Sequence, residues 1–278
     1  MAQWRQWQVE LPGKPEIVRI LGEGLSNHSY LLKAGENRMV LRINNNDGQL
    51  PGIDHQREAM IWRAASEAGI APALLHAGNR YLVSSFVPDE TFSPDHKGSS
   101  WTPEAQAREN CTANDLADQV FGLIEKCHAI KIDTQQLDYA QHIQSYWAKI
   151  EQSAIAQSGT EQTGKLIDPA LINQRQAMQE SLQALSAQQQ ESVLCHHDPV
   201  MANFVGSPKR LYLIDWEYAA KGMAVMDYAA LAVEWGFSDA TICARTNIRL
   251  DSLVMAKKLY RYMCLLWAMA QSEPSPAS

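Results

Sequence analysis

The spacing of apolar residues changes near Pro88, and this change limits what the chain can fold into. Up to residue 88, short apolar and β-branched runs alternate with Gly and Asn turns, which is typical of consecutive antiparallel strands. Beyond it, apolar residues recur at the spacing of long helices. The sequence therefore predicts an α+β protein in which a small N-terminal antiparallel sheet with one helix precedes a larger, mostly helical part.

The individual elements are predicted from the same pattern. Strands are expected at 17–21, 30–34, 39–43 and twice within 74–88, and helices at 55–68, 115–130, 139–157, 169–188, 226–236 and 250–270. A Thr-Pro-Glu sequence at Thr102 has the N-cap and N1-proline signature of a further helix start. One β-rich island, residues 192–219, interrupts the helices. The predicted division is an N-terminal lobe (1–88, with a hinge at about 84–88), a C-terminal lobe (89–271) and a flexible tail (272–278).

Composition excludes several classes of protein. The chain is 46% apolar and 20% charged, as globular proteins are, and its net charge of −7 argues against nucleic-acid binding. Its five scattered cysteines form no CxxC pair and are expected to be reduced thiols rather than a disulfide frame or a zinc site. Without a signal peptide or an apolar run of about 18 residues, we expect a cytoplasmic protein that contacts no membrane. No protein partner is evident.

Charge is distributed unevenly along the chain. Residues 1–88 hold 9 basic and 8 acidic residues, whereas residues 89–278 hold 15 and 23. An acidic helical part would attract a cationic substrate and repel an anionic one. The alternative, that acidic helices only keep the protein soluble, explains the same asymmetry.

The β-rich island carries the residues best suited to chemistry. His196-x-Asp198 is followed five residues later by Asn203, then by two short strands, and then by Asp215-Trp216-Glu217. A hairpin of these strands would let the side chains of Asp198, Asn203 and Asp215 converge. Hard oxygen ligands without a thiolate suit Mg²⁺ held together with nucleotide phosphates, and one carboxylate would remain to accept a proton from an attacking hydroxyl.

This pattern resembles the catalytic segment of the aminoglycoside phosphotransferase and choline kinase superfamily, and most of all its bacterial choline kinase-like and thiamine kinase-like members. The superfamily has a bilobal protein-kinase-like fold. The resemblance runs in order from about residue 20 to 235 and includes LGEGLSNHSYLL, MVLRI, REAMIWRAASEAGIAP, YLVSSFV and VMDYAAL. A protein substrate is not expected, because the metal motif is DWE rather than DFG and no long activation segment ending in APE follows it.

The resemblance implies a role for each matching residue in binding ATP and Mg²⁺. Asp198 is implied to be the catalytic base, and Asn203 and Asp215 to hold Mg²⁺. Arg42, in place of the lysine usual in protein kinases, is implied to pair with the nucleotide phosphates and with Glu58. Further nucleotide contacts are expected for Ser26 and Asn27, at the phosphates, and for Ser84 and Phe86 of the hinge, at the adenine.

The acceptor is expected to be a small cationic alcohol. Aromatic rings beside carboxylates bind quaternary ammonium and thiazolium groups by cation–π attraction, and the chain has eight tryptophans. The residues expected to contact the acceptor are Glu217, Trp216, Glu234, Trp235 and Trp267, of which Glu234-Trp235 resembles a Glu-Trp pair of choline kinases. Choline or thiamine is therefore preferred, with an aminoglycoside phosphotransferase or an inactive kinase-like binding module as alternatives.

Several residues of the same segments also have simpler interpretations. A zinc or hydrolase site at His196-His197-Asp198 is disfavoured, since no third His or Cys lies at ligand spacing. His196 is expected to shape the loop, and His197 to be incidental. Asp227 is expected to be the N-cap of the following helix, although in the superfamily an Asp here often braces the catalytic loop. Glu217 would contact a second Mg²⁺, face the substrate or cap a turn.

Overall fold

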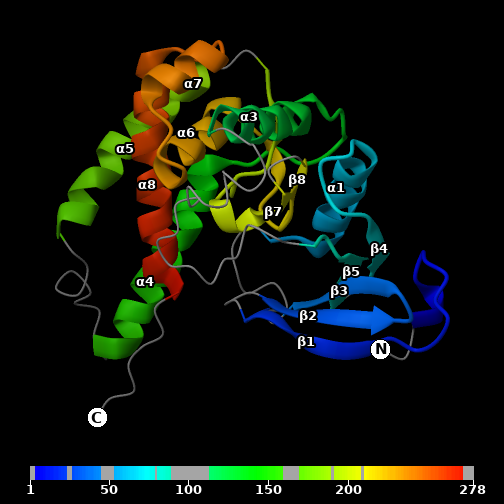
Figure 1. Cartoon of the computed structure of the whole chain (residues 1–278). Helices are drawn as coiled ribbons and strands as arrows, with labels where there is room; N and C mark the ends of the chain where they lie inside the picture. Colours follow the sequence, from blue (N-terminus) through cyan, green and yellow to red (C-terminus); the bar gives the residue numbers. More distant parts are fainter. Residues whose placement is uncertain are drawn as a thin grey trace. The chain divides into compact units, whose positions relative to one another are not determined.

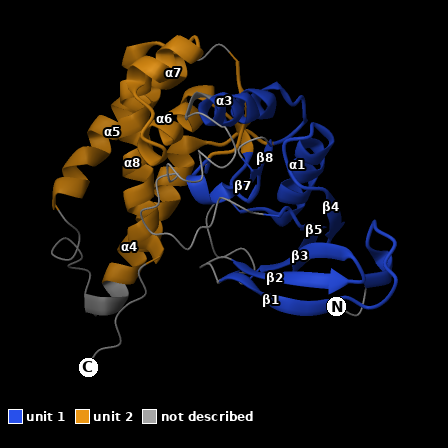
Figure 2. Cartoon of the chain, in the orientation of Figure 1, with its two compact units in different colours: residues 1–134, 198–219 blue, residues 135–197, 220–278 orange. Residues whose placement is uncertain are grey.

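The structure is a computed structural model, and it describes residues 4–23, 27–44, 53–78, 80–88, 113–158, 169–188, 191–207 and 210–271. Ser26, the helix start predicted at Thr102, and the tail 272–278 lie outside these residues. The chain forms two compact units, residues 1–134 with 198–219 and residues 135–197 with 220–278 (Figure 2). The lobe boundary predicted near residue 88 stays a prediction.

The N-terminal part of the first unit is a five-stranded sheet. Its strands are β1 Glu16–Glu23, β2 Asn27–Ala34, β3 Asn37–Asn44, β4 Leu74–Ala77 and β5 Tyr81–Ser85, in the order β1-β2-β3-β5-β4 (Figure 1). All four pairings are antiparallel. One face packs Leu32, Met39, Leu41 and Val83 against Trp7, which follows the short 3₁₀ turn Trp4–Gln6. Because side chains alternate along a strand, Arg42 lies on the opposite face of β3.

Helix α1, His55–Glu67, brings a carboxylate toward the arginine face of the sheet. It begins where it does because the Asp54 side chain accepts hydrogen bonds from the backbone N–H groups of Gln56 and Arg57. It ends at Glu67 with Ala68 as its C-cap, and the φ of 72° at the next residue, Gly69, suits a glycine after a helix. Glu58, in its first turn, is completely buried.

The β-rich island contains the predicted hairpin. Its strands are β7 Phe204–Ser207 and β8 Arg210–Leu213, and the 3₁₀ turn Met201–Asn203 comes directly before β7. The backbone N–H of Leu213 donates to Ile70 O at 2.7 Å, and that of Leu211 donates to the Gln119 side chain of helix α3, Ala113–Ala129, at 3.1 Å. The hairpin is thus fixed both to the end of α1 and to α3.

Replacing Gly206 in this hairpin with alanine is expected to lower the free energy of unfolding by about 2 kcal/mol or more. Gly206 has a φ of 123°, and a Cβ there would lie 2.3 Å from Arg210 O. Gly122→Ala in α3 is the control, because no atom lies within 4 Å of its Cβ position and alanine favours a helix. Urea unfolding measures both variants, and a Gly206→Ala protein as stable as the wild type would contradict this turn geometry.

The second unit is built around one long helix. Helix α8, Leu250–Gln271, packs against α4 Tyr139–Ser158, α5 Pro169–Gln188, α6 Ala224–Glu234 and α7 Asp239–Arg245 (Figure 1). Its buried face includes Leu253, Ala256, Leu259 and Leu266. A two-stranded antiparallel ribbon, β6 Val193–Cys195 with β9 Ala220–Gly222, completes the unit.

The predicted α+β arrangement is confirmed, with an antiparallel sheet first and a larger helical region after it. The helix and strand predictions agree with the described elements to within a few residues, but α7 and β9 were missed. Both are short, with seven and three residues, so neither shows a clear hydrophobic period. Among the described residues, every helix is too short or too polar to span a bilayer.

Candidate active site

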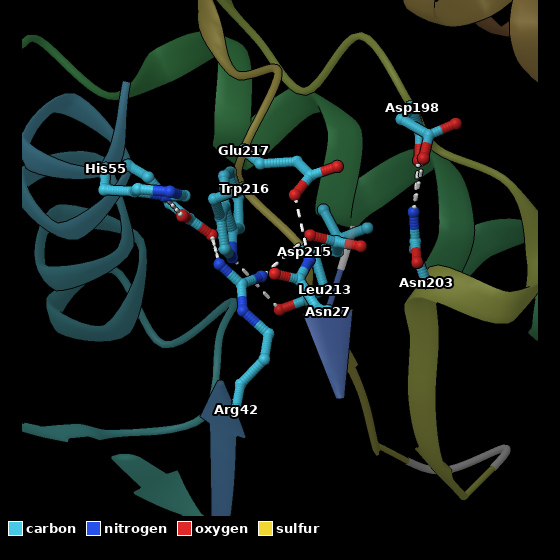
Figure 3. Close-up of polar contacts among 10 residues, drawn as sticks. Asn27, Arg42, His55, Asp198, Asn203, Leu213, Asp215, Trp216 and Glu217 are labelled. Carbon is cyan, nitrogen blue, oxygen red and sulfur yellow. Dashed lines mark hydrogen bonds and ion pairs between the residues drawn. The ribbon is translucent and has the colours of Figure 1, made fainter. Parts of the chain in front are cut away.

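The hairpin brings together the three residues predicted to carry the chemistry. Ile214 N–H donates to Asn203 O at 2.9 Å, so Asp215 follows directly beside the turn that holds Asn203. Asn203 Nδ2 donates to Asp198 O at 2.8 Å and to Asp198 Oδ2 at 2.9 Å (Figure 3). Asp198 and Asn203 are thus in contact and Asp215 lies beside their turn, while the convergence of the three side chains on one ion and their roles stay predictions.

The contact between Asn203 and Asp198 fixes the orientation of the Asn203 amide. Both groups that it meets are oxygen acceptors, so the NH₂ end of the amide must face them and Oδ1 must point elsewhere. Asn203 is only 7% exposed, which holds this orientation. The Asn203 amide oxygen and the Asp215 carboxylate are hard donors of the kind that Mg²⁺ prefers, so these residues fit the predicted metal site.

Asp215 has an unusual backbone conformation. Its φ is 65°, in the left-handed region that residues other than glycine seldom adopt. Such a conformation costs on the order of 1 kcal/mol and tends to persist where a side chain must point in one direction. The Asp215 side chain is 32% exposed and forms an ion pair with Arg42, so the strained residue presents a carboxylate at the site.

Arg42 links the sheet to α1 and to the hairpin. Its Nη2 pairs with Glu58 Oε1, and its Nη1 donates to Asp215 Oδ1 at 2.8 Å (Figure 3). His55 Nδ1 lies 3.4 Å from the other Glu58 oxygen, and the Trp62 ring lies 5.8 Å from the guanidinium. This arrangement holds a buried positive charge on the same face of the sheet as Asn27.

The charged groups in this cluster shift one another's pKa values. Burial disfavours the charged form of Arg42, but Glu58 and Asp215 outweigh it and raise the pKa of Arg42. Burial likewise favours neutral Glu58, but Arg42 and then His55 hold the pKa of Glu58 below its ordinary value. The pair is therefore fully ionised at neutral pH.

Glu217 belongs to the same cluster. Its Oε2 accepts a hydrogen bond of 2.9 Å from Nδ2 of Asn27, a predicted phosphate contact, and the residue is 4% exposed (Figure 3). Burial first, and then the negative charge of Asp215, raise the pKa of Glu217 to about 7. A cation bound beside Asp215 would favour the charged form of Glu217.

Three other predicted residues of the first unit are placed as follows. Trp216 is completely buried and donates its indole N–H to Leu213 O at 3.3 Å, so the structure shows a packing role for it and gives no support to a direct substrate contact. Ser84 is buried in β5. Phe86 N–H donates to Arg38 O at 3.2 Å. Contacts of this segment with adenine stay a prediction.

The second unit holds the remaining predicted acceptor contacts. Glu234, exposed at the end of α6, accepts a hydrogen bond of 3.2 Å from the Tyr260 hydroxyl on α8. Trp235 is partly exposed and stacks on Phe237, with ring centroids 6.0 Å apart. Trp267 is half-buried on α8. An acid and aromatic rings thus gather around the end of α6.

Two simpler interpretations of the sequence are wrong. Asp227 lies inside α6, where Met223 is the N-cap, and its carboxylate accepts the backbone N–H groups of His196 at 2.9 Å and His197 at 2.8 Å. It braces the segment before Asp198, as the resemblance suggested. His197 is not incidental, because its ring is hydrogen-bonded to Tyr139, a residue that no sequence motif indicates.

The buried pair of Arg42 on β3 with Glu58 on α1, together with the Asp198–Asn203–Asp215 hairpin, is the arrangement expected from the resemblance to kinase-like phosphotransferases. The chain belongs to the phosphotransferase enzyme family, whose model matches residues 17–252. The superfamily predicted from the motifs is thereby confirmed, and the protein is a small-molecule kinase-like phosphotransferase. No curated protein sequence matches the chain.

Solved structures show the same fold. The chain is similar to choline kinase LicA from Streptococcus pneumoniae, at 19% identity and a TM-score of 0.68, with 91% of this chain and 86% of that one covered. It is similar to a choline/ethanolamine kinase family protein from Mesorhizobium loti, at 21% identity and a TM-score of 0.59, covering 93% and 78%. It is also similar to spectinomycin phosphotransferase APH(9)-Ia, in complex with ADP and spectinomycin, at 14% identity and a TM-score of 0.56, covering 93% and 87%.

Proposed function

We propose that the protein transfers the γ-phosphoryl group of ATP to the hydroxyl of a small cationic metabolite, with choline and thiamine as the preferred acceptors. The observation that carries the proposal is the hydrogen-bonded Asp198–Asn203 pair at the end of the hairpin that also presents Asp215. Phosphoryl transfer asks a protein mainly for positioning and for charge stabilisation, and these residues supply both.

Each residue has a separate task in this proposal. Asp198, held by Asn203 Nδ2, orients the acceptor hydroxyl and takes its proton. Asn203 Oδ1 and Asp215 would hold Mg²⁺, which when bound supplies positive charge to the triphosphate. Arg42 is the permanent cation for the phosphates, and Glu58 keeps it directed into the site.

Nucleotide use is supported by the relatives. LicA has been crystallised in complex with AMP, and spectinomycin phosphotransferase with ADP. In the present chain Arg42 contacts Asp215 and Asn27 contacts Glu217. We infer that bound phosphates replace the two carboxylates as partners of Arg42 and Asn27, and that the metal ion replaces Arg42 as the partner of Asp215. Each group is then exchanged for one that can make the same kind of contact.

A cationic acceptor is supported by charge and by aromatic content. Residues 89–278 carry 23 acidic and 15 basic residues. The exposed Glu234 carboxylate and the Trp235 ring at the end of α6 are the types of group that stabilise a quaternary ammonium or thiazolium ion. Choline kinases are also among the structural relatives.

A panel of acceptors tests the proposal. ADP release from Mg·ATP is measured with choline, ethanolamine, thiamine, homoserine and kanamycin. We expect turnover with choline or thiamine to exceed turnover with the other three by at least about tenfold. Turnover with kanamycin alone would assign an antibiotic phosphotransferase, and ATP binding without turnover on any acceptor would assign a kinase-like binding module.

A further inference from the structure

Tyr139 joins three segments of the second unit through one hydroxyl group. Its oxygen accepts the backbone N–H of Met223 at 3.1 Å and lies 2.8 Å from His197 Nε2. The two rings also meet edge to face, with centroids 5.6 Å apart. Tyr139, at the start of α4, is 5% exposed, so this contact is buried. The hydroxyl thus ties α4 to the N-cap residue of α6 and to the segment that leads into Asp198.

The hydrogen bonds allow two positions for the proton of this contact. The Met223 N–H is a donor, so the Tyr139 hydroxyl oxygen accepts there. Among the described residues its other partner is His197 Nε2, and which of these two groups donates depends on the imidazole tautomer. If Tyr139 donates, neutral His197 holds its proton on Nδ1; if Nε2 donates, the hydroxyl oxygen accepts from both neighbours. Either arrangement joins Tyr139 to the His197 ring.

The backbone of His197 explains why this contact matters. His197 has a φ of 65°, in the left-handed region, where a histidine is strained. Its N–H is held by Asp227 Oδ1 and its ring by Tyr139, so both ends of the residue are fixed. The next peptide bond leads into Asp198, and the dihedral angles of His197 set the direction of that bond.

Gly222 confirms that the contact is tightly enclosed. A Cβ at this position of β9 would lie 2.5 Å from the Tyr139 hydroxyl and 2.6 Å from His197 Nε2. Both distances are below van der Waals contact, so only glycine leaves room for the bond. The chain therefore places a residue without a side chain where the hydroxyl and the imidazole meet.

We propose that Tyr139 is a positioning residue for the catalytic loop, and that its hydroxyl holds His197 in the left-handed conformation that directs Asp198. This inference rests on the proposed function, because it assigns the effect of Tyr139 to the step that Asp198 performs. A small displacement of a catalytic group lowers the rate of the chemical step without affecting substrates bound elsewhere. Tyr139 thus acts on turnover rather than on binding.

The Tyr139→Phe variant tests the proposal in steady-state kinetics. We expect kcat to fall by ~10-fold or more, with the KM values for ATP and for the acceptor unchanged within about twofold. Tyr262→Phe is the matched control, since the Tyr262 hydroxyl is also buried and accepts the Trp147 indole N–H at 2.9 Å. Both variants are expected to lower the melting temperature by roughly 2–4 °C. Equal kcat values for the two variants would overturn the proposal.

A second variant separates positioning from simple stability. Glycine adopts positive φ without strain, so His197→Gly should keep the turn without help from the hydroxyl. We expect Tyr139→Phe to change kcat by less than about twofold in the His197→Gly background. An undiminished ~10-fold loss in that background would show that Tyr139 does not act through His197.

The tautomer of His197 gives a readout that needs no turnover. In nitrogen-15 NMR spectra of the full chain, we expect His197 to show one preferred tautomer, and this preference to be lost in Tyr139→Phe. A wild-type protein that turns over no acceptor would contradict the proposed function, and the spectra would then decide the hydrogen bond on their own. A His197 tautomer that is the same in the wild type and in Tyr139→Phe would overturn the proposal.

Discussion

Replacing Asp198 with asparagine is expected to lower kcat by ~100- to 10,000-fold, the range that general base catalysis contributes. Asparagine keeps an oxygen that can accept the hydrogen bond from Asn203 Nδ2, so the loop should retain its shape. It loses the negative charge that, in the proposed mechanism, orients the acceptor hydroxyl and takes its proton. Asp198→Ala should lose as much activity.

The affinity for Mg·ATP should be nearly unchanged in both Asp198 variants, since Arg42, Asn203 and Asp215 remain. A thermal shift on adding Mg·ATP measures this, because a ligand that binds the native state raises its apparent stability. Asp133→Asn is the control, as this exposed aspartate lies in the segment between α3 and α4 and belongs to neither the hairpin nor the predicted site. Wild-type turnover by Asp198→Asn would refute its assignment as the base.

Replacing Arg42 with methionine is expected to lower the free energy of unfolding by about 3–5 kcal/mol at neutral pH. The substitution fills similar space but leaves the completely buried Glu58 carboxylate without its cation. Asp215 also loses its partner, but its partial exposure makes that loss smaller. Affinity for ATP should fall as well, because the proposed phosphate contact is removed. Arg38→Met, on an exposed position of the same strand, should change stability by less than about 0.5 kcal/mol.

The loss in the Arg42→Met variant should depend on pH. In the wild type the pKa of Glu58 is lowered from 4.5, so the pair contributes stability above that value and loses it as the pH falls through the folded-state pKa. In the variant, burial raises the pKa of Glu58, and acid relieves the cost by protonating it. The difference between the two proteins should therefore be largest at about pH 7 and shrink toward about pH 4. Urea unfolding at both pH values measures it, and a difference that grows in acid would contradict the buried ion pair.

The sequence identified those parts of the site whose partners are close along the chain or set by strand pairing. Asp198, Asn203 and Asp215 lie within eighteen residues of one another, and a short hairpin leaves them few arrangements. Arg42 follows an alternating strand, so its face of the sheet could be inferred from Met39 and Leu41. These short-range constraints also made the N-terminal strands and α1 predictable.

The remaining contacts join residues that the sequence does not relate. Asp227 is an aspartate near the start of a helix, which is typical of a cap, and only the folded chain shows that its oxygens meet the amides of His196 and His197. Tyr139 is 58 residues from His197, and its hydroxyl gives no local signal. Trp216 was selected as an aromatic ring beside carboxylates, and only the folded chain shows that it is completely buried and bonded to Leu213 O. The positive φ of His197 is a backbone property, and it could not be predicted from the presence of a histidine at this position.

The most direct test of the central claim follows the phosphorus atoms themselves. Phosphorus-31 NMR of wild-type protein with Mg·ATP and choline or thiamine should show the γ-phosphate signal disappear as a phosphomonoester signal and ADP appear, and the Asp198→Asn protein should leave ATP intact. Release of inorganic phosphate from a phosphoester without ATP, or ester formation at the wild-type rate by Asp198→Asn, would contradict an ATP-dependent phosphotransferase centred on Asp198, Asn203 and Asp215.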